Sequence, residues 1–115
     1  MATRLNDKGY DKARALVLED QVVRDGRDDW SEHQPDTAAE NRFIDEHGWQ
    51  AYGEWHLGSD DEHGPETKAH WKYPYGDFRK VHRCALLSAE SRAGRNDHDD
   101  IREKAHELHR LLEQD

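Results

Sequence analysis

The chain has 115 residues with 26 acidic and 17 basic side chains, so its formal net charge at pH 7 is −9. This length predicts a single domain, and the negative charge weighs against a protein whose main partner is nucleic acid, because it repels phosphate backbones. The lone cysteine, Cys84, excludes an intrachain disulfide and fits a reducing cytoplasm. No apolar run approaches the roughly 18 residues that a membrane span requires. We therefore expect a small acidic cytoplasmic protein without membrane contact.

The beginning of the chain gives the weakest structural signal. Residues 1–13 are polar and show no periodicity, which predicts a disordered N-terminus followed by one compact domain over residues 14–115. The apolar residues 15–18 and the stretch 22–24 are separated by a short polar turn, and this pattern predicts a small β-hairpin. The polar residues 25–36 then read as a connector.

A helix is predicted in the middle of the chain. Thr37 and Glu40 have the spacing of a capping box, in which a hydroxyl and a carboxylate each bond a free N–H at a helix start. The helix should run to His47 and end at Gly48, which can adopt the left-handed conformation of a helix terminus. Residues 49–58 fit both helical spacing and strand alternation. We expect a short helical turn there, followed by an extended segment that joins the hairpin.

The C-terminal part has the clearest pattern. Asp77 is a candidate N-cap for a helix over residues 78–92, which Gly94 should end, and residues 98–113 should form a second helix. Apolar residues in this second helix recur at i, i+4, i+7 and i+11, an amphipathic stripe typical of a helix that packs on one face. Two helices joined by a short loop should fold back on each other. The predicted fold is α+β and predominantly helical, with a C-terminal helical hairpin and a small N-terminal β-hairpin.

Several short segments resemble a group of small uncharacterised bacterial proteins, chiefly actinobacterial. The segments are Gly48-Trp49, Tyr52 to Gly58, Glu66-Thr67-Lys68, Tyr73 to Phe78, Val81 to Leu87 and Ala89 to Gly94. This resemblance covers about residues 15–112. A looser one over residues 72–112 is similar to C-terminal modules of some phage-encoded proteins. Neither group implies an activity, a cofactor or a catalytic residue.

The nine histidines raise the question of a metal site. Glu103, His106 and His109 follow one another at successive i+3 spacings, so the three side chains could converge on one helix face. Zinc sites need three or four ligands, and di-iron helical bundles need a matching Glu-x-x-His pair from a second helix, which the sequence lacks. We therefore interpret these histidines as solvated surface residues and predict no metal and no cofactor, with a His-based metal-binding protein as an alternative.

His82 and Cys84 suggest a base and a nucleophile. Two residues apart on a helix, their side chains would point about 200° away from each other and could not form a dyad. A single cysteine among apolar residues is usually inert packing. The sequence therefore predicts no catalytic residue and a protein that is not an enzyme.

Residues 68–95 are basic and rich in aromatic side chains, a combination typical of single-stranded nucleic-acid surfaces. A nucleic-acid-associated protein that uses this segment is therefore one alternative function. The favoured interpretation is that the acidic residues 60–62 fold over the basic helix and that the aromatics fill the core. On that interpretation a nucleic-acid partner is not expected, although the alternative stays open.

The main functional prediction is a non-catalytic protein-interaction or accessory module, with a homodimer through an apolar helix face or a Trp patch as one form of it. The sequence does not identify the protein partner. The candidate interaction residues are Trp49, Trp55, Trp71, Tyr75, Arg79, Lys80 and Arg83.

Overall fold

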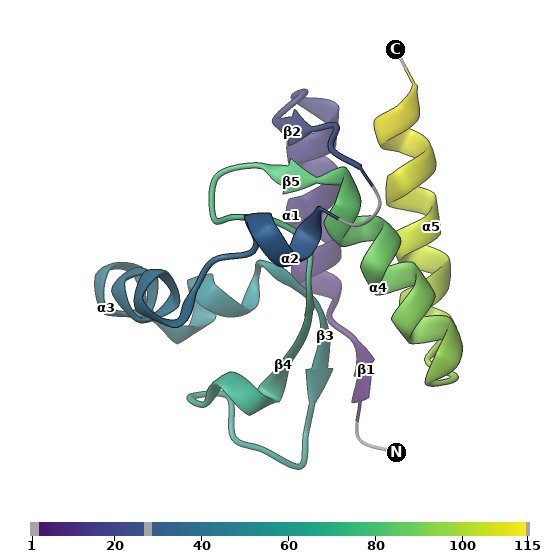
Figure 1. The fold of residues 1–115 in the computed structure, drawn as a ribbon. Coiled ribbons are helices and arrows are strands. Elements are labelled where there is room, and N and C mark those ends of the chain that lie inside the picture. Colours follow the sequence, from purple (N-terminus) through teal and green to yellow (C-terminus); the bar gives the residue numbers. More distant parts are fainter. Residues whose placement is uncertain (1–2, 27–28, 115) are drawn as a thin grey trace.

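The computed structural model describes residues 3–26 and 29–114 and shows a mainly helical α+β fold (Figure 1). In chain order the elements are β1 (Thr3–Leu5), α1 (Asp7–Leu18), β2 (Val22–Val23), α2 (Trp30–His33), α3 (Thr37–Gly53), β3 (His56–Asp60), the 3-10 helix η1 (Lys68–His70), β4 (Trp71–Pro74), β5 (Val81–His82), α4 (Arg83–Arg95) and α5 (Asp99–Glu113).

Two small sheets join distant parts of the chain. In the first, β3 lies between β1 and β4 and pairs antiparallel with both, so that Leu5 is opposite Gly58 and Lys72 is opposite the same glycine on the other side. In the second, β2 and β5 pair in parallel, with Val22 opposite Val81. The second sheet therefore places the segment that follows β2 beside the start of α4.

The N-terminus differs from its prediction. Residues 3–5 and 7–18 form β1 and α1 in place of the expected disorder, whereas residues 1 and 2 lie outside the described part. The stripe that α1 buries consists of Gly9, Ala13 and Val17 at i, i+4 and i+8, and two of these residues are too small to stand out as hydrophobic. The predicted β-hairpin is wrong as well, because residues 15–18 end α1 and β2 pairs with β5.

The middle helix begins one residue earlier than its predicted cap. Asp36, rather than Thr37, is the N-cap of α3, and its Oδ1 accepts from the N–H of Ala39 at 2.8 Å. Gly48 interrupts the helix at φ 89° and ψ 170°, a conformation that is essentially restricted to glycine. A helical turn continues to Gly53, and β3 follows. The expected order, a helical turn followed by an extended segment, is correct. The extended segment does not pair with the predicted hairpin, however; it forms β3, which pairs with β1 and β4.

The helix α4 begins at Arg83 rather than at the predicted Phe78. The carboxylate of Asp77 does accept backbone N–H groups, from Arg79 at 3.0 Å and from Lys80 at 2.8 Å, but these bonds close a loop. Phe78 within that loop has φ 71°, which no α-helix allows. Asp77 therefore does accept backbone N–H groups as predicted, but it stabilises a turn and not the start of a helix.

The helices α4 and α5 follow each other and pack side by side (Figure 1). The main core lies between them, α1 and the three-stranded sheet. Its buried members are Ala13, Val17, Trp55, Leu57, Tyr73, Tyr75, Val81, Leu86, Ala89, Ala93, Ile101, Ala105, Leu108 and Leu112. The buried residues of α4 include the small Ala85, Ala89 and Ala93, and those of α5 include the larger Ile101, Leu108 and Leu112.

The contact between α1 and β3 requires a glycine. A Cβ on Gly9 would lie 1.8 Å from the carbonyl oxygen of His56, a backbone atom that cannot move aside alone. We expect Gly9→Ala to lower the free energy of unfolding by about 2 kcal/mol, measured by urea denaturation, because overpacking typically costs about 1–3 kcal/mol. The control is Gly64→Ala, where an added Cβ meets nothing within 4 Å. Equal stability of the two variants would contradict the close contact.

Candidate metal centre

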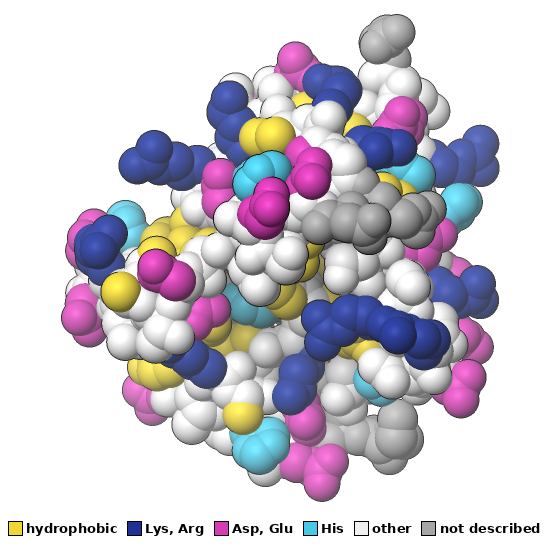
Figure 2. Space-filling view, in the orientation of Figure 1, with side chains coloured by type: hydrophobic (Ala, Val, Ile, Leu, Met, Phe, Trp, Pro, Cys, Tyr) yellow, Lys and Arg dark blue, Asp and Glu magenta, His cyan; other side chains and the backbone are white. Residues whose placement is uncertain are grey.

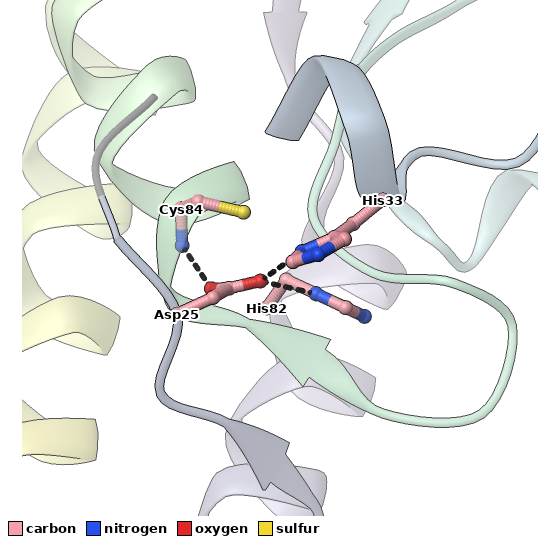
Figure 3. Close-up of side chains that lie close together, drawn as sticks. All are labelled: Asp25, His33, His82 and Cys84. Atoms are coloured by element: carbon pink, nitrogen blue, oxygen red, sulfur yellow. Dashed lines mark hydrogen bonds and ion pairs between the residues drawn. The ribbon is translucent and has the colours of Figure 1, made fainter. Parts of the chain in front are cut away.

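Four side chains with metal-ligating atoms converge beside the start of α4 (Figure 3). Asp25 lies between β2 and α2, His33 ends α2, His82 ends β5, and Cys84 lies in the first turn of α4. One ligating atom from each residue lies within 4.8 Å of the corresponding atoms of the other three. The parallel pairing of β2 with β5 brings them together, because it aligns the chain after Val23 with the chain after His82.

Asp25 is the centre of the cluster. Its Oδ1 accepts from the backbone N–H of Cys84 at 2.8 Å, and its Oδ2 lies 2.7 Å from the Nδ1 atoms of both His33 and His82. The side chain is only 6% exposed. Burial alone would raise the pKa of Asp25, but the hydrogen bonds from Cys84, His82 and His33 together hold it well below its ordinary value. Asp25 is thus ionised and caps α4 from a distant part of the chain.

His82 is held at both ring nitrogens. Its Nδ1–H donates to Oδ2 of Asp25, and its Nε2–H donates to Oδ2 of Asp77 at 2.9 Å. Burial favours the neutral ring, but the hydrogen bonds and charges of Asp77 and Asp25 outweigh it and raise the pKa of His82. Asp77 responds in the opposite sense: burial raises its pKa, but His82 and the N–H groups of the loop lower it to about 2.

Cys84 is a poor nucleophile in this environment. Burial, and then the neighbouring carboxylate of Asp25, raise the pKa of the thiol to about 12, so it carries a proton at neutral pH. The geometric argument against a pair with His82 was wrong, because His82 precedes α4 and the sulfur of Cys84 lies within 4.8 Å of a ring nitrogen of His82. The prediction that Cys84 is not a catalytic nucleophile therefore rests on its protonation.

The cluster has an apolar neighbour in Trp30 and an exposed member in His33. Trp30 is 7% exposed and packs with Cys84 and Ala85 in a small separate core, and its ring centroid lies 5.6 Å from that of His82. The side chain of His33 is 38% exposed. His33 is therefore the member of the cluster that contacts water, and Trp30 shields His82 from it.

The aromatic residues predicted for an interaction surface fall into two places. Trp55 and Tyr75 are buried in the main core, where their rings stack with centroids 5.4 Å apart, so neither is available on the surface. Trp49 and Trp71 are half-buried and line a cavity of about 420 Å³ next to Gly53. Of these four aromatic residues, only Trp49 and Trp71 are accessible for an interaction role, which stays a prediction.

The basic residues predicted for an interaction surface are also divided. Arg79 and Lys80 are exposed in the loop after Asp77. Arg83 is engaged, because it contacts Glu113 and donates from Nη1 to the carbonyl oxygen of Asp25 at 3.2 Å. Lys and Arg side chains are interspersed with Asp and Glu across the visible face (Figure 2).

The predicted acidic cover over the basic helix is not found. Asp61 forms an ion pair with Arg4 instead, and Asp60 is buried and accepts from the N–H of Glu62. Sequence analysis also missed Asp25 and His33, which lie in a polar segment without periodicity. No local pattern distinguishes them there from surface residues.

No helix among residues 3–26 and 29–114 is both long enough and apolar enough to span a bilayer. Comparisons of the chain with models of protein families, with curated proteins and with solved structures give no match, so the resemblance to bacterial and phage-encoded proteins stays a prediction.

Proposed function

We propose that the protein binds one divalent transition-metal ion of the zinc class at Asp25, His33, His82 and Cys84. The observation that carries the proposal is the convergence of one oxygen, two nitrogen and one sulfur donor within 4.8 Å. Zinc bonds of about 2.0–2.3 Å in a tetrahedron place the donor atoms about 3.3–3.8 Å apart. Shifts of about an ångström would therefore convert the hydrogen-bonded cluster into a coordination shell.

The contact between Asp77 and His82 supports this assignment. A histidine that binds a metal usually donates its other N–H to a carboxylate, which fixes the tautomer and orients the ring. Asp77 occupies that position at Nε2 and leaves Nδ1 of His82 for the ion. The ion would replace the protons that His82 and Cys84 carry toward Asp25.

Four ligands from the chain complete a tetrahedral shell, and this favours a structural role over a catalytic one, because catalytic zinc keeps an open position. The ligands come from the segment before and within α2 and from the segment that starts α4. The ion would therefore act as a clamp that fastens Asp25 and α2 to α4. We propose that the α4–α5 pair, the helical hairpin expected from the sequence, is the scaffold for this clamp, in agreement with a protein that is not an enzyme.

Cobalt titration tests the proposal, because Cys84 is the only cysteine and only this site can give a thiolate-to-cobalt charge-transfer band. We expect the band to saturate at one equivalent of Co²⁺ and excess Zn²⁺ to abolish it. His33→Ala should weaken binding at least about 100-fold, and Asp77→Asn about 10–100-fold, the usual effect of losing an outer-shell partner. The asparagine introduced by Asp77→Asn keeps an oxygen for the loop N–H groups, so the fold should persist.

The matched control is His47→Ala. His47 is exposed on α3 and is not part of the cluster. The titration should be unchanged in this variant. Folded wild-type protein that gives no charge-transfer band at any cobalt concentration would rule out the site.

The protein-interaction module remains a second candidate, which the groove at Trp49 and Trp71 supports. The indole N–H of Trp71 donates to the carbonyl oxygen of Pro65 at 3.1 Å, and its ring lies against Gly53, where an added Cβ would come within 2.6 Å. This fixes the ring as one wall of the groove. A protein captured from source lysate by the wild type and lost with Trp49→Ala would support the role.

The homodimer is one form of this module. Light scattering tests it: a molar mass equal to that of one chain at high protein concentration would contradict the homodimer.

A further inference from the structure

We infer that the α4–α5 pair holds a second, exchangeable divalent metal ion at Glu90, His106 and His109. Glu90 lies on α4, and the two histidines lie one turn apart on α5. One ligating atom from each residue lies within 4.8 Å of the other two. This set shares no residue with the cluster at Asp25.

The geometry places a carboxylate against an imidazole across the two helices. Nδ1 of His106 lies 2.7 Å from Oε1 of Glu90. Their side chains are 53% and 27% exposed, so the pair faces water and an ion could reach it directly. Glu103, which the sequence suggested as the third ligand, is not part of the group; the neighbouring helix supplies the carboxylate instead.

His109 adds an observation of its own. Its Nε2 is buried and has no hydrogen-bond partner among the described residues. The nearest carboxylate is Oε1 of Glu113 at 3.4 Å, and Arg83 holds Glu113 in place. A buried polar atom without a hydrogen-bond partner destabilises the folded protein. A metal ion would offset this cost by binding Nε2 of His109. If it bound the other ring nitrogen, it would instead strengthen the contact between Nε2 and Glu113.

The donor set indicates the class of metal. Two imidazoles and one carboxylate suit Zn²⁺, Co²⁺, Ni²⁺ or Cu²⁺, and three protein ligands leave at least one position for water. The absence of sulfur and the exposure of His106 predict weaker and faster binding than at the four-ligand site. We therefore assign this site to an ion that exchanges with solution.

The two sites can be separated by experiment. The total Zn²⁺ bound is measured by titration against a chromophoric chelator, and the thiolate-to-cobalt band reports only the site at Cys84. We expect two equivalents of zinc for the wild type. His106→Ala should bind one equivalent and keep the band unchanged, whereas His33→Ala should lose the band and keep the weaker equivalent.

The substituted residues are exposed, so both variants should fold, and circular dichroism verifies this. The control is His63→Ala, an exposed loop histidine outside both groups, which should bind like the wild type. The inference is overturned if His106→Ala binds as many equivalents as the wild type with the same affinities. It is also overturned if His33→Ala binds no zinc.

Discussion

Replacing Asp25 by alanine is expected to lower the free energy of unfolding of the metal-free protein by about 3 kcal/mol. The substitution removes the acceptor that caps α4 at Cys84, a loss that costs about 1 kcal/mol for an ordinary N-cap. It also leaves the buried His82 with one carboxylate in place of two, and breaking a buried ion pair costs about 3–5 kcal/mol when a charge is left uncompensated. Because Asp77 still pairs with His82, no charge is left uncompensated, so this second loss lies below that range, at about 2 kcal/mol.

Urea denaturation in the presence of a chelator measures this change. Asp25→Asn keeps an oxygen that can accept from the N–H of Cys84 and removes only the charge, so it should be less harmful than alanine. The surface control is Asp61→Ala, which breaks the exposed ion pair with Arg4 and should cost about 0–1 kcal/mol. A loss below about 1 kcal/mol for Asp25→Ala would show that the cap and the charge contacts are not important to the fold.

Acidification from pH 7 to pH 4 is expected to remove about 3 kcal/mol of stability through His56. Burial lowers the pKa of His56 to about 4, in spite of the hydrogen bond from Nδ1–H to the carbonyl oxygen of Tyr52. An unfolded histidine has a pKa of about 6.5, so between these values the unfolded chain binds a proton that the folded chain does not. The contribution of His56 is therefore complete above about pH 6.5 and falls as the pH approaches 4.

His56→Gln isolates this effect, because glutamine keeps an N–H donor and does not titrate. Its free energy of unfolding should fall less steeply between pH 6.5 and pH 4 than that of the wild type. His82 acts in the opposite direction: its raised pKa gives a contribution that is complete at low pH and is lost as the pH rises through the folded pKa. That contribution is present in both proteins and cancels in the comparison. Equal pH dependence of the wild type and His56→Gln would contradict the prediction.

The sequence predicted those elements whose burial repeats along one helix face. Ile101, Ala105, Leu108 and Leu112 form the stripe expected for the last helix, and all four are buried in α5. The same reasoning missed α1, where Gly9 and Ala13 are buried without a hydrophobic signature. Burial of small residues is decided by how closely a neighbour approaches, and that information lies in the tertiary structure.

The first residue of α4 could not be predicted from the neighbouring sequence, for a similar reason. An aspartate that accepts two N–H groups begins either a helix or a turn, and Asp77 does the second. The carboxylate that does cap α4 belongs to Asp25, in a segment that looked like a connector. The capping carboxylate and the helix that it caps are 59 residues apart in the chain. A short stretch of sequence around the start of α4 therefore cannot reveal the cap.

The candidate metal centre follows the same rule. His82 and Cys84 were singled out from the sequence, but the assumption that both were helical pointed their side chains apart. Their partners Asp25 and His33 carry no local signal. Pairing between β2 and β5 makes the site, and two valines in a two-residue strand give no indication of which distant strand they join.

The bond between Asp25 and Cys84 closes a loop between residues 59 positions apart in the chain. Closing such a loop costs chain entropy before its contacts can stabilise the protein. Folding rates accordingly fall as the mean sequence separation of contacts rises. This protein should therefore refold more slowly than a helical bundle of its size. During synthesis, its first quarter must wait for the second half to emerge before either can reach the native arrangement.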